Sequence, residues 1–188
     1  MIRLFTVLFN IDLNTLPTAL SLFHAVYKGF NIHKVHCPGC NALGCLKEHD
    51  KYTHNLVDYY ANSLQEGQVE VHRALCSSCG GTFAVLPDLL IPYKSYSILF
   101  IMMVLKAYYF KKETVTALCS RYGISVSTLY AWKKRYLAHK TLNLGKLAKY
   151  FYPEDPHLSE PCNICFTPFL YDFFSRFGFS FLQFHNTT

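Results

Sequence analysis

Two Cys-x-x-Cys pairs constrain how the first half of the chain can fold. Cys37 and Cys40 enclose Pro-Gly, and Cys76 and Cys79 enclose Ser-Ser. A tight turn of this spacing can present two thiolates to one ion, and two such turns complete a tetrahedral site. We therefore predict a structural zinc site that has these four cysteines as its ligands.

The stretch between the two pairs is long for such a site. It holds 35 residues (76 − 40 − 1), whereas about 15–20 residues are common in zinc ribbons. An inserted excursion over residues 50–67 would account for the excess. Residues 68–75 alternate in polarity and predict a strand, and Gly80 and Gly81 turn the chain into a returning strand over residues 82–86.

Other metal-binding side chains leave alternatives open. Cys45 or a nearby histidine could replace one ligand, although a single such residue is more often a surface or packed side chain; the histidines are His33, His36, His49, His54 and His72. A third pair, Cys162 and Cys165, has no partner pair. It binds nothing, forms a half-site across a dimer, or completes a second site with Cys45.

The chain changes to a helical period after residue 95. We predict helices over residues 96–110, 113–122 and 125–138. In the second of these, Val115, Leu118, Cys119 and Tyr122 recur on one face, with Cys119 as a packing residue. Gly123 follows at a position that favours a turn, and Ser125 is a suitable N-cap for the third helix.

The third helix has the pattern of a DNA-reading helix. Its predicted buried stripe is Val126, Leu129, Trp132 and Tyr136. Residues 106–149 contain ten Lys/Arg and one acid, which gives +9, while the rest of the chain sums to −3. A local positive charge of this kind suits contact with phosphates. We predict contacts to double-stranded DNA from Ser125, Ser127, Thr128, Tyr130, Ala131, Lys133, Lys134 and Arg135.

The same region resembles a known class of proteins. Residues 114–134, TVTALCSRYGISVSTLYAWKK, look like the helix-turn-helix of bacterial insertion-sequence transposases, and CSSCGGTF over residues 76–83 resembles the second knuckle of their zinc ribbons. The link LPDLLIPY over residues 86–93 is similar to that of a small group of transposase-related bacterial proteins. The resemblance covers residues 36–140. It implies DNA binding by a mobile-element protein, with a separate transposase subunit as a partner.

The catalytic part of such transposases does not carry over. They cut DNA with three carboxylates that hold two Mg²⁺ ions in a ribonuclease-H-like domain. Only 48 residues follow Lys140, and their acids are Glu154, Asp155, Glu160 and Asp172. No Ser-His-Asp order, Gly-rich phosphate loop or His-Glu-x-x-His helix appears either, so we expect no enzyme. A zinc hydrolase or nuclease fragment would need an open position on the metal, which four cysteine ligands would close.

These patterns together predict the α+β class, with a zinc-ribbon β unit followed by a trihelical helix-turn-helix domain and helical additions at both ends. The boundaries are residues 1–35, 36–92, 93–140 and 141–188, with additional helices over residues 12–27 and 166–184. The chain shows no signal-peptide pattern, and its apolar run over residues 98–105 is far shorter than the roughly 20 residues of a membrane span. We expect a cytoplasmic protein without a membrane partner. A homodimer, a transcription regulator unrelated to transposition and a protein-interaction module remain alternatives.

Overall fold

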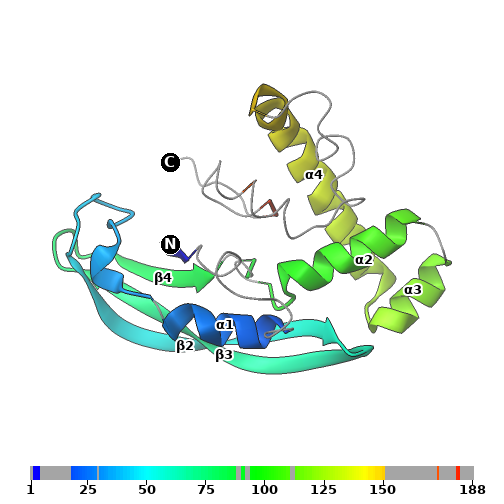
Figure 1. Ribbon diagram of the computed structural model, residues 1–188, viewed down its shortest axis with the longest axis horizontal. Helices are drawn as coiled ribbons and strands as arrows, with labels where there is room; N and C mark the ends of the chain where they lie inside the picture. The colour runs from blue at the N-terminus through cyan, green and yellow to red at the C-terminus, as the bar shows by residue number, and fades with distance from the viewer. Residues whose placement is uncertain are drawn as a thin grey trace. The chain divides into compact units, whose positions relative to one another are not determined.

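The computed structural model describes residues 2–4, 18–28, 30–87, 90–91, 94–110, 113–150, 173 and 181–182. Figure 1 shows the elements in chain order: β1 (Ile2–Leu4), α1 (Ala19–Lys28), the 3₁₀ turn η1 (Ile32–Lys34), β2 (Leu46–Tyr60), β3 (Ser63–Cys76), β4 (Thr82–Pro87), α2 (Ile98–Phe110), α3 (Val115–Tyr122) and α4 (Val126–Tyr150). The predicted α+β class is confirmed. The chain forms two compact units, Met1–Tyr60 with Gln65–Ser97 and Ala61–Leu64 with Ile98–Thr188.

The sheet has the strand order β1-β4-β3-β2. β1 runs parallel to β4, with Ile2 opposite Val85, and this strand is absent from the sequence-based prediction. β3 and β4 are antiparallel. A long β2–β3 hairpin fills most of the interval between the cysteine pairs. The insertion that was predicted over residues 50–67 is therefore a continuous hairpin, and it extends beyond those residues at both ends. Its two turn residues, Ala61 and Asn62, have φ of 50° and 61°, as a two-residue hairpin turn requires.

Helix α1 packs on the sheet within the first unit. Ala19 and Phe23 of this helix join one apolar cluster with Leu90, which follows β4, and with side chains of the strands, namely Leu56, Val69, Val71 and Leu86. The buried carboxylate of Asp58 accepts a hydrogen bond of 2.6 Å from the N–H of Ala19 and one of 2.9 Å from the hydroxyl of Ser97. This carboxylate satisfies a first-turn N–H that has no partner inside the helix. Residues 12–17 of the predicted helix lie outside the described residues.

The second unit contains three helices that pack against one another, α2, α3 and α4. The ring of Phe100 lies at its centre, 6.1 Å from the ring of Tyr122 and 5.7 Å from that of Trp132. Helix α2 begins at Ile98 instead of residue 96, because Tyr96 and Ser97 form β-bridges. Thr114 caps α3 by accepting a hydrogen bond from the N–H of Ala117.

Helix α4 is longer than the predicted helix and extends to Tyr150 instead of residue 138. Its buried stripe continues through His139 and Asn143. The prediction missed this part of the stripe because it was based on apolar residues and these two are polar. Val126 is 43% exposed, so its predicted place in the stripe is wrong. Of the predicted helix over residues 166–184, only residues 173, 181 and 182 are described; the rings of Phe173 and Phe181 are buried, and that of Phe181 lies 5.8 Å from Tyr136. Across the described residues, none of the helices has the length and apolar character that a bilayer crossing requires.

Candidate functional site

The two cysteine turns share one backbone design. In each turn the carbonyl oxygen of the first cysteine accepts a hydrogen bond from the N–H of the residue four positions later. The N–H of the first cysteine donates to the carbonyl oxygen of the residue five positions later. These bonds measure 2.8 and 2.9 Å at Cys37, and both measure 2.9 Å at Cys76. The residue four positions later is left-handed in both turns, with φ of 60° at Asn41 and 70° at Gly80. The chain therefore builds the same two-thiol turn twice from different residues.

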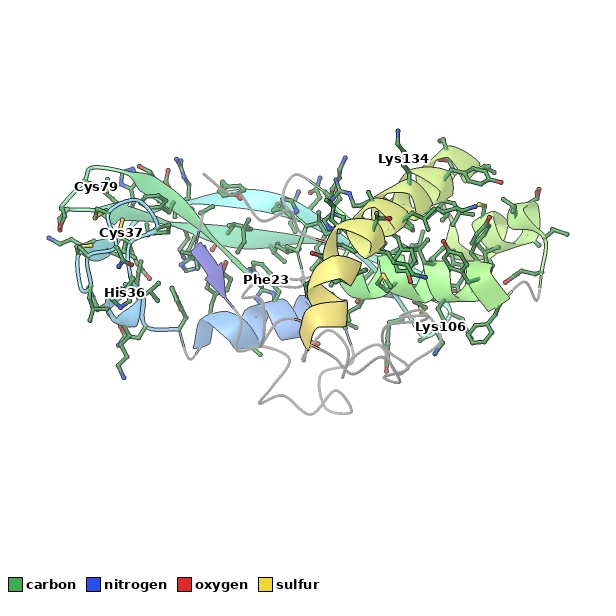
Figure 2. The ribbon with its side chains drawn as sticks, turned by 90° about the horizontal axis from the view of Figure 1, so that it is seen from above. Phe23, His36, Cys37, Cys79, Lys106 and Lys134 are labelled. Carbon is green, nitrogen blue, oxygen red and sulfur yellow. The ribbon has the colours of Figure 1, made fainter. Side chains whose placement is uncertain are left out.

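The turns bring the four predicted ligands together. Their sulfur atoms all lie within 4.8 Å of one another, and no other metal-binding group of this kind occurs among the residues that the structure describes. The distance is 3.7 Å from Cys37 Sγ to Cys79 Sγ and 3.7 Å from Cys40 Sγ to Cys76 Sγ. Figure 2 shows Cys37 and Cys79 beside each other, one from each turn. Since a zinc–sulfur bond is about 2.3 Å, sulfurs at the corners of a tetrahedron are separated by about 3.8 Å. The four cysteines thus fit a tetrahedral metal ion.

Backbone N–H groups near these sulfurs favour the thiolate form, but they do not determine the pKa at every cysteine. Hydrogen bonding to the N–H of Cys79 lowers the pKa of Cys76 to about 6. The N–H of Gly81 acts in the same direction on Cys79, but the neighbouring Cys76 sulfur and burial raise the pKa of Cys79 to about 11. A negative charge on the Cys76 sulfur thus disfavours ionisation of the neighbouring thiols, and a bound cation would offset this repulsion.

Phe83 packs against both turns, a feature that the sequence analysis did not identify. A Cβ atom added at Gly39 would lie 3.1 Å from Phe83 Cζ, and one added at Gly81 would lie 2.8 Å from the same atom. Both positions also lie within 3.5 Å of Cys79 Sγ. A side-chain carbon at Gly81 would therefore fit only if the Phe83 ring shifted. The only sequence signal was an aromatic residue four positions after the last cysteine.

The other candidate ligands lie elsewhere. His36 Nδ1 is 2.9 Å from the carbonyl oxygen of Asn41, His54 Nε2 is 3.1 Å from that of Lys94, and the ring of His72 stacks on Tyr27 at 4.4 Å. His33 and His49 are exposed. Cys45 is buried beside the centre but belongs to none of the four corners. Cys162 and Cys165 lie outside the described residues.

A second candidate site is the exposed face of α4. The hydroxyl of Ser125 accepts a hydrogen bond of 3.0 Å from the N–H of Thr128, so Ser125 caps the helix. Ser127, Ala131 and Lys134 are exposed, and their spacing places them on one stripe of the helix. Trp132 and Tyr136 are buried, which fixes this stripe towards solvent.

The other predicted DNA contacts differ in how accessible they are. Tyr130 is 46% exposed. Lys133 donates a hydrogen bond of 3.0 Å to the hydroxyl of Tyr108 and lies over the Tyr108 ring, an arrangement that raises its pKa. Arg135 is half-buried, and its burial lowers its pKa. Among these cations, Lys134 is the one that the structure leaves exposed on the helix surface.

Cys119 lies in α3 and is buried, as expected of a packing residue, and this burial raises the pKa of its thiol. Gly123 ends that helix with φ of 61°, and a Cβ atom there would lie 2.5 Å from Leu64 Cδ1 within the same unit. The turn between α3 and α4 therefore favours glycine for its backbone conformation, and a larger residue would also displace the Leu64 side chain. This turn fixes how the exposed stripe of α4 is presented.

Comparison with known proteins gives a family without an assigned activity. No curated protein and no solved structure matches the chain. One family model matches residues 37–132, which begin at the first of the four clustered cysteines and end inside α4. The match spans 96 of 188 residues (132 − 37 + 1), just over half of the chain. The chain therefore belongs to the family described as a domain of unknown function (DUF6431).

Proposed function

We propose that this chain is a non-catalytic DNA-binding protein in which zinc shapes the first unit as a zinc ribbon and α3–α4 act as a helix-turn-helix. The exposed stripe of Ser127, Ala131 and Lys134 is the observation that carries the proposal. Short side chains at the start of a helix let it approach base edges, while a cation further along meets phosphates.

The charge distribution supports the same reading. Residues 106–149 carry a net charge of +9, whereas the remainder of the chain is slightly acidic. A duplex presents a dense row of negative charge, so a protein with one basic region binds it through that region. In this proposal Lys134 contacts a phosphate directly, while Lys133 and Arg135 contribute to the local positive potential from their packed positions.

The metal has a structural role in this proposal. Four sulfur ligands complete the coordination of zinc and leave no position for a substrate. Hard cations prefer oxygen ligands, so calcium or magnesium does not fit this donor set. Zinc would hold the two cysteine turns together at the end of the β2–β3 hairpin.

A single lysine gives the sharpest test of DNA binding. Lys134→Ala should weaken binding to every duplex and reduce the slope of log K against log salt concentration by about 1. Lys51→Ala is the matched control, because Lys51 is also exposed but forms an ion pair with Glu70 on the hairpin. Equal losses in the two variants would show that the effect is one of net charge and would overturn the proposed role of α4.

The resemblance to transposases adds an expectation about the target. We propose that the chain recognises the terminal repeats of a mobile element, alongside a separate transposase subunit. Selection of preferred sequences from a random duplex pool tests this expectation. Recovery of the ends of insertion sequences would support it, whereas recovery of a promoter palindrome would favour a transcription regulator.

A protein-interaction module is the second candidate, and one observation favours it. Leu137 and Leu142 on the later part of α4 are 43% and 63% exposed, which is high for leucine. Zinc-loaded protein that has no affinity for duplex DNA at low salt would make this candidate the better account.

A further inference from the structure

Cys45 lies directly beside the metal centre although it is not one of the four ligands. Its Sγ atom is 3.3 Å from Cys76 Sγ, which is shorter than the 3.7 Å between the ligand pairs. Its thiol also lies 3.2 Å from the carbonyl oxygen of Ala42, to which it can donate. The centre therefore has a fifth sulfur within reach of one corner of the tetrahedron.

The backbone of Cys45 is held in place by the second cysteine turn. Its carbonyl oxygen accepts two hydrogen bonds from Ser77, one of 2.9 Å from the N–H and one of 3.0 Å from the hydroxyl. The next residue, Leu46, is fully buried and begins β2. The backbone of Cys45 is thus held beside the second cysteine turn. Its Sγ atom lies 3.3 Å from that of Cys76, which is less than the roughly 3.8 Å edge of a zinc–sulfur tetrahedron.

We propose that Cys45 is an alternate metal ligand that replaces Cys76, and this inference rests on the metal centre of the proposed function. In the exchange, the bond from the metal to Cys76 Sγ breaks and a bond to Cys45 Sγ forms. The proton leaves the Cys45 thiol and is taken up by the Cys76 sulfur beside it. The ion keeps four sulfur ligands and the net charge of the centre is unchanged.

The other three ligands have no such replacement among the residues described. The structure places Cys45 outside the group of four mutually close sulfurs, and among those four its short sulfur contact is with Cys76. Loss of Cys76 and loss of Cys79 should therefore have different consequences, although the two residues occupy opposite ends of the same turn.

Cobalt spectroscopy of the purified full chain tests the proposal. Co²⁺ bound to wild type should show the charge-transfer absorbance of four thiolates. Cys76→Ser should keep that intensity because Cys45 enters the site, whereas Cys79→Ser and the double variant Cys76→Ser with Cys45→Ser should lose about one quarter of it, as expected for three thiolates on a tetrahedral ion. A three-thiolate spectrum from Cys76→Ser would overturn the proposal, while a wild type without the four-thiolate spectrum would overturn the metal centre itself.

A second measurement covers the case in which Cys76→Ser does not fold. Zinc-loaded wild type is treated with iodoacetamide in timed pulses, and the modified cysteines are identified by mass spectrometry. Exchange releases the Cys76 sulfur, so Cys76 should be alkylated more slowly in the Cys45→Ser variant than in wild type. Equal rates of Cys76 alkylation in the two proteins would show that Cys45 does not enter the site.

Discussion

Asn41 and Gly80 occupy equivalent positions in the two cysteine turns, each directly after the second cysteine and each in the left-handed region, with φ of 60° and 70°. Each donates its N–H to the carbonyl of the first cysteine in its turn. Asparagine and glycine are the residues that adopt this conformation most readily. In each turn, a residue that accepts a positive φ therefore allows the backbone to place the two cysteine sulfurs on the same side.

This equivalence predicts different responses to substitution. Gly80→Val should destabilise the metal-loaded protein by about 1–2 kcal/mol, because a β-branched residue does not tolerate a positive φ. Asn41→Gly should change the free energy of unfolding by less than about 0.5 kcal/mol, because glycine accepts the same backbone angles. Urea denaturation with zinc present measures both. A neutral Gly80→Val would contradict the proposed backbone requirement.

Removal of the metal should loosen the cysteine turns but leave the three-helix packing intact. In the proposed centre the two turns are joined by one ion bound to four sulfurs, whereas the rings of Phe100, Tyr122 and Trp132 pack without it. Hydrogen exchange before and after chelation should show lost protection at the N–H groups of Cys37 and Cys76 and little change in α2–α4. Unchanged protection of both N–H groups would mean that the turns do not need the metal.

The buried carboxylate of Asp58 should be important for stability. Asp58→Ala would leave the N–H of Ala19 and the hydroxyl of Ser97 without their acceptor, at a cost of about 2–4 kcal/mol. Asp50→Ala is the control, because Asp50 forms an exposed ion pair with Arg73 and should cost less than about 1 kcal/mol. Comparable unfolding free energies for the two variants would refute this role of Asp58.

His139 should make the protein sensitive to mild acid. Burial and nearby Arg135 lower its pKa from 6.5 to about 4. Below pH 6.5 the unfolded chain then binds more protons at this histidine than the folded chain does. The contribution of neutral His139 to the free energy of unfolding is therefore full above pH 6.5. It is lost progressively as the pH falls to 4, by up to about 3 kcal/mol. In His139→Gln the unfolding free energy should depend less steeply on pH across this window. The same steepness in wild type and variant would show that other groups are responsible.

The sequence predicted best the parts of the fold that follow from local rules. The four cysteines were identified by spacing, and α3 by the period of Leu118, Cys119 and Tyr122, all of which are buried. Gly123 and Ser125 correctly marked the turn because capping is decided by neighbouring residues. These features could be found without knowledge of distant contacts.

Features that depend on tertiary contacts were missed or misjudged. Residues 47–53 of β2 are exposed without interruption, so they offer no alternation by which a strand could be recognised. His139 is buried despite its polarity because the ring of Phe181, 42 residues later (181 − 139), lies against it. Cys45 could be noted as a nearby thiol, but its contact with Cys76 depends on how β2 leaves the first turn.

The central claim is that the chain, with its metal bound, binds duplex DNA through the basic helical unit. The most direct measurement is the affinity of zinc-loaded wild type for a random-sequence duplex across a salt series, with bound zinc quantified in the same sample. We predict that the four-cysteine centre binds one zinc ion. We also predict that the association constant for DNA decreases steeply with salt, and that log K falls linearly with the logarithm of the salt concentration. A zinc-loaded protein whose DNA affinity is absent at low salt, or does not change with salt, would contradict the account.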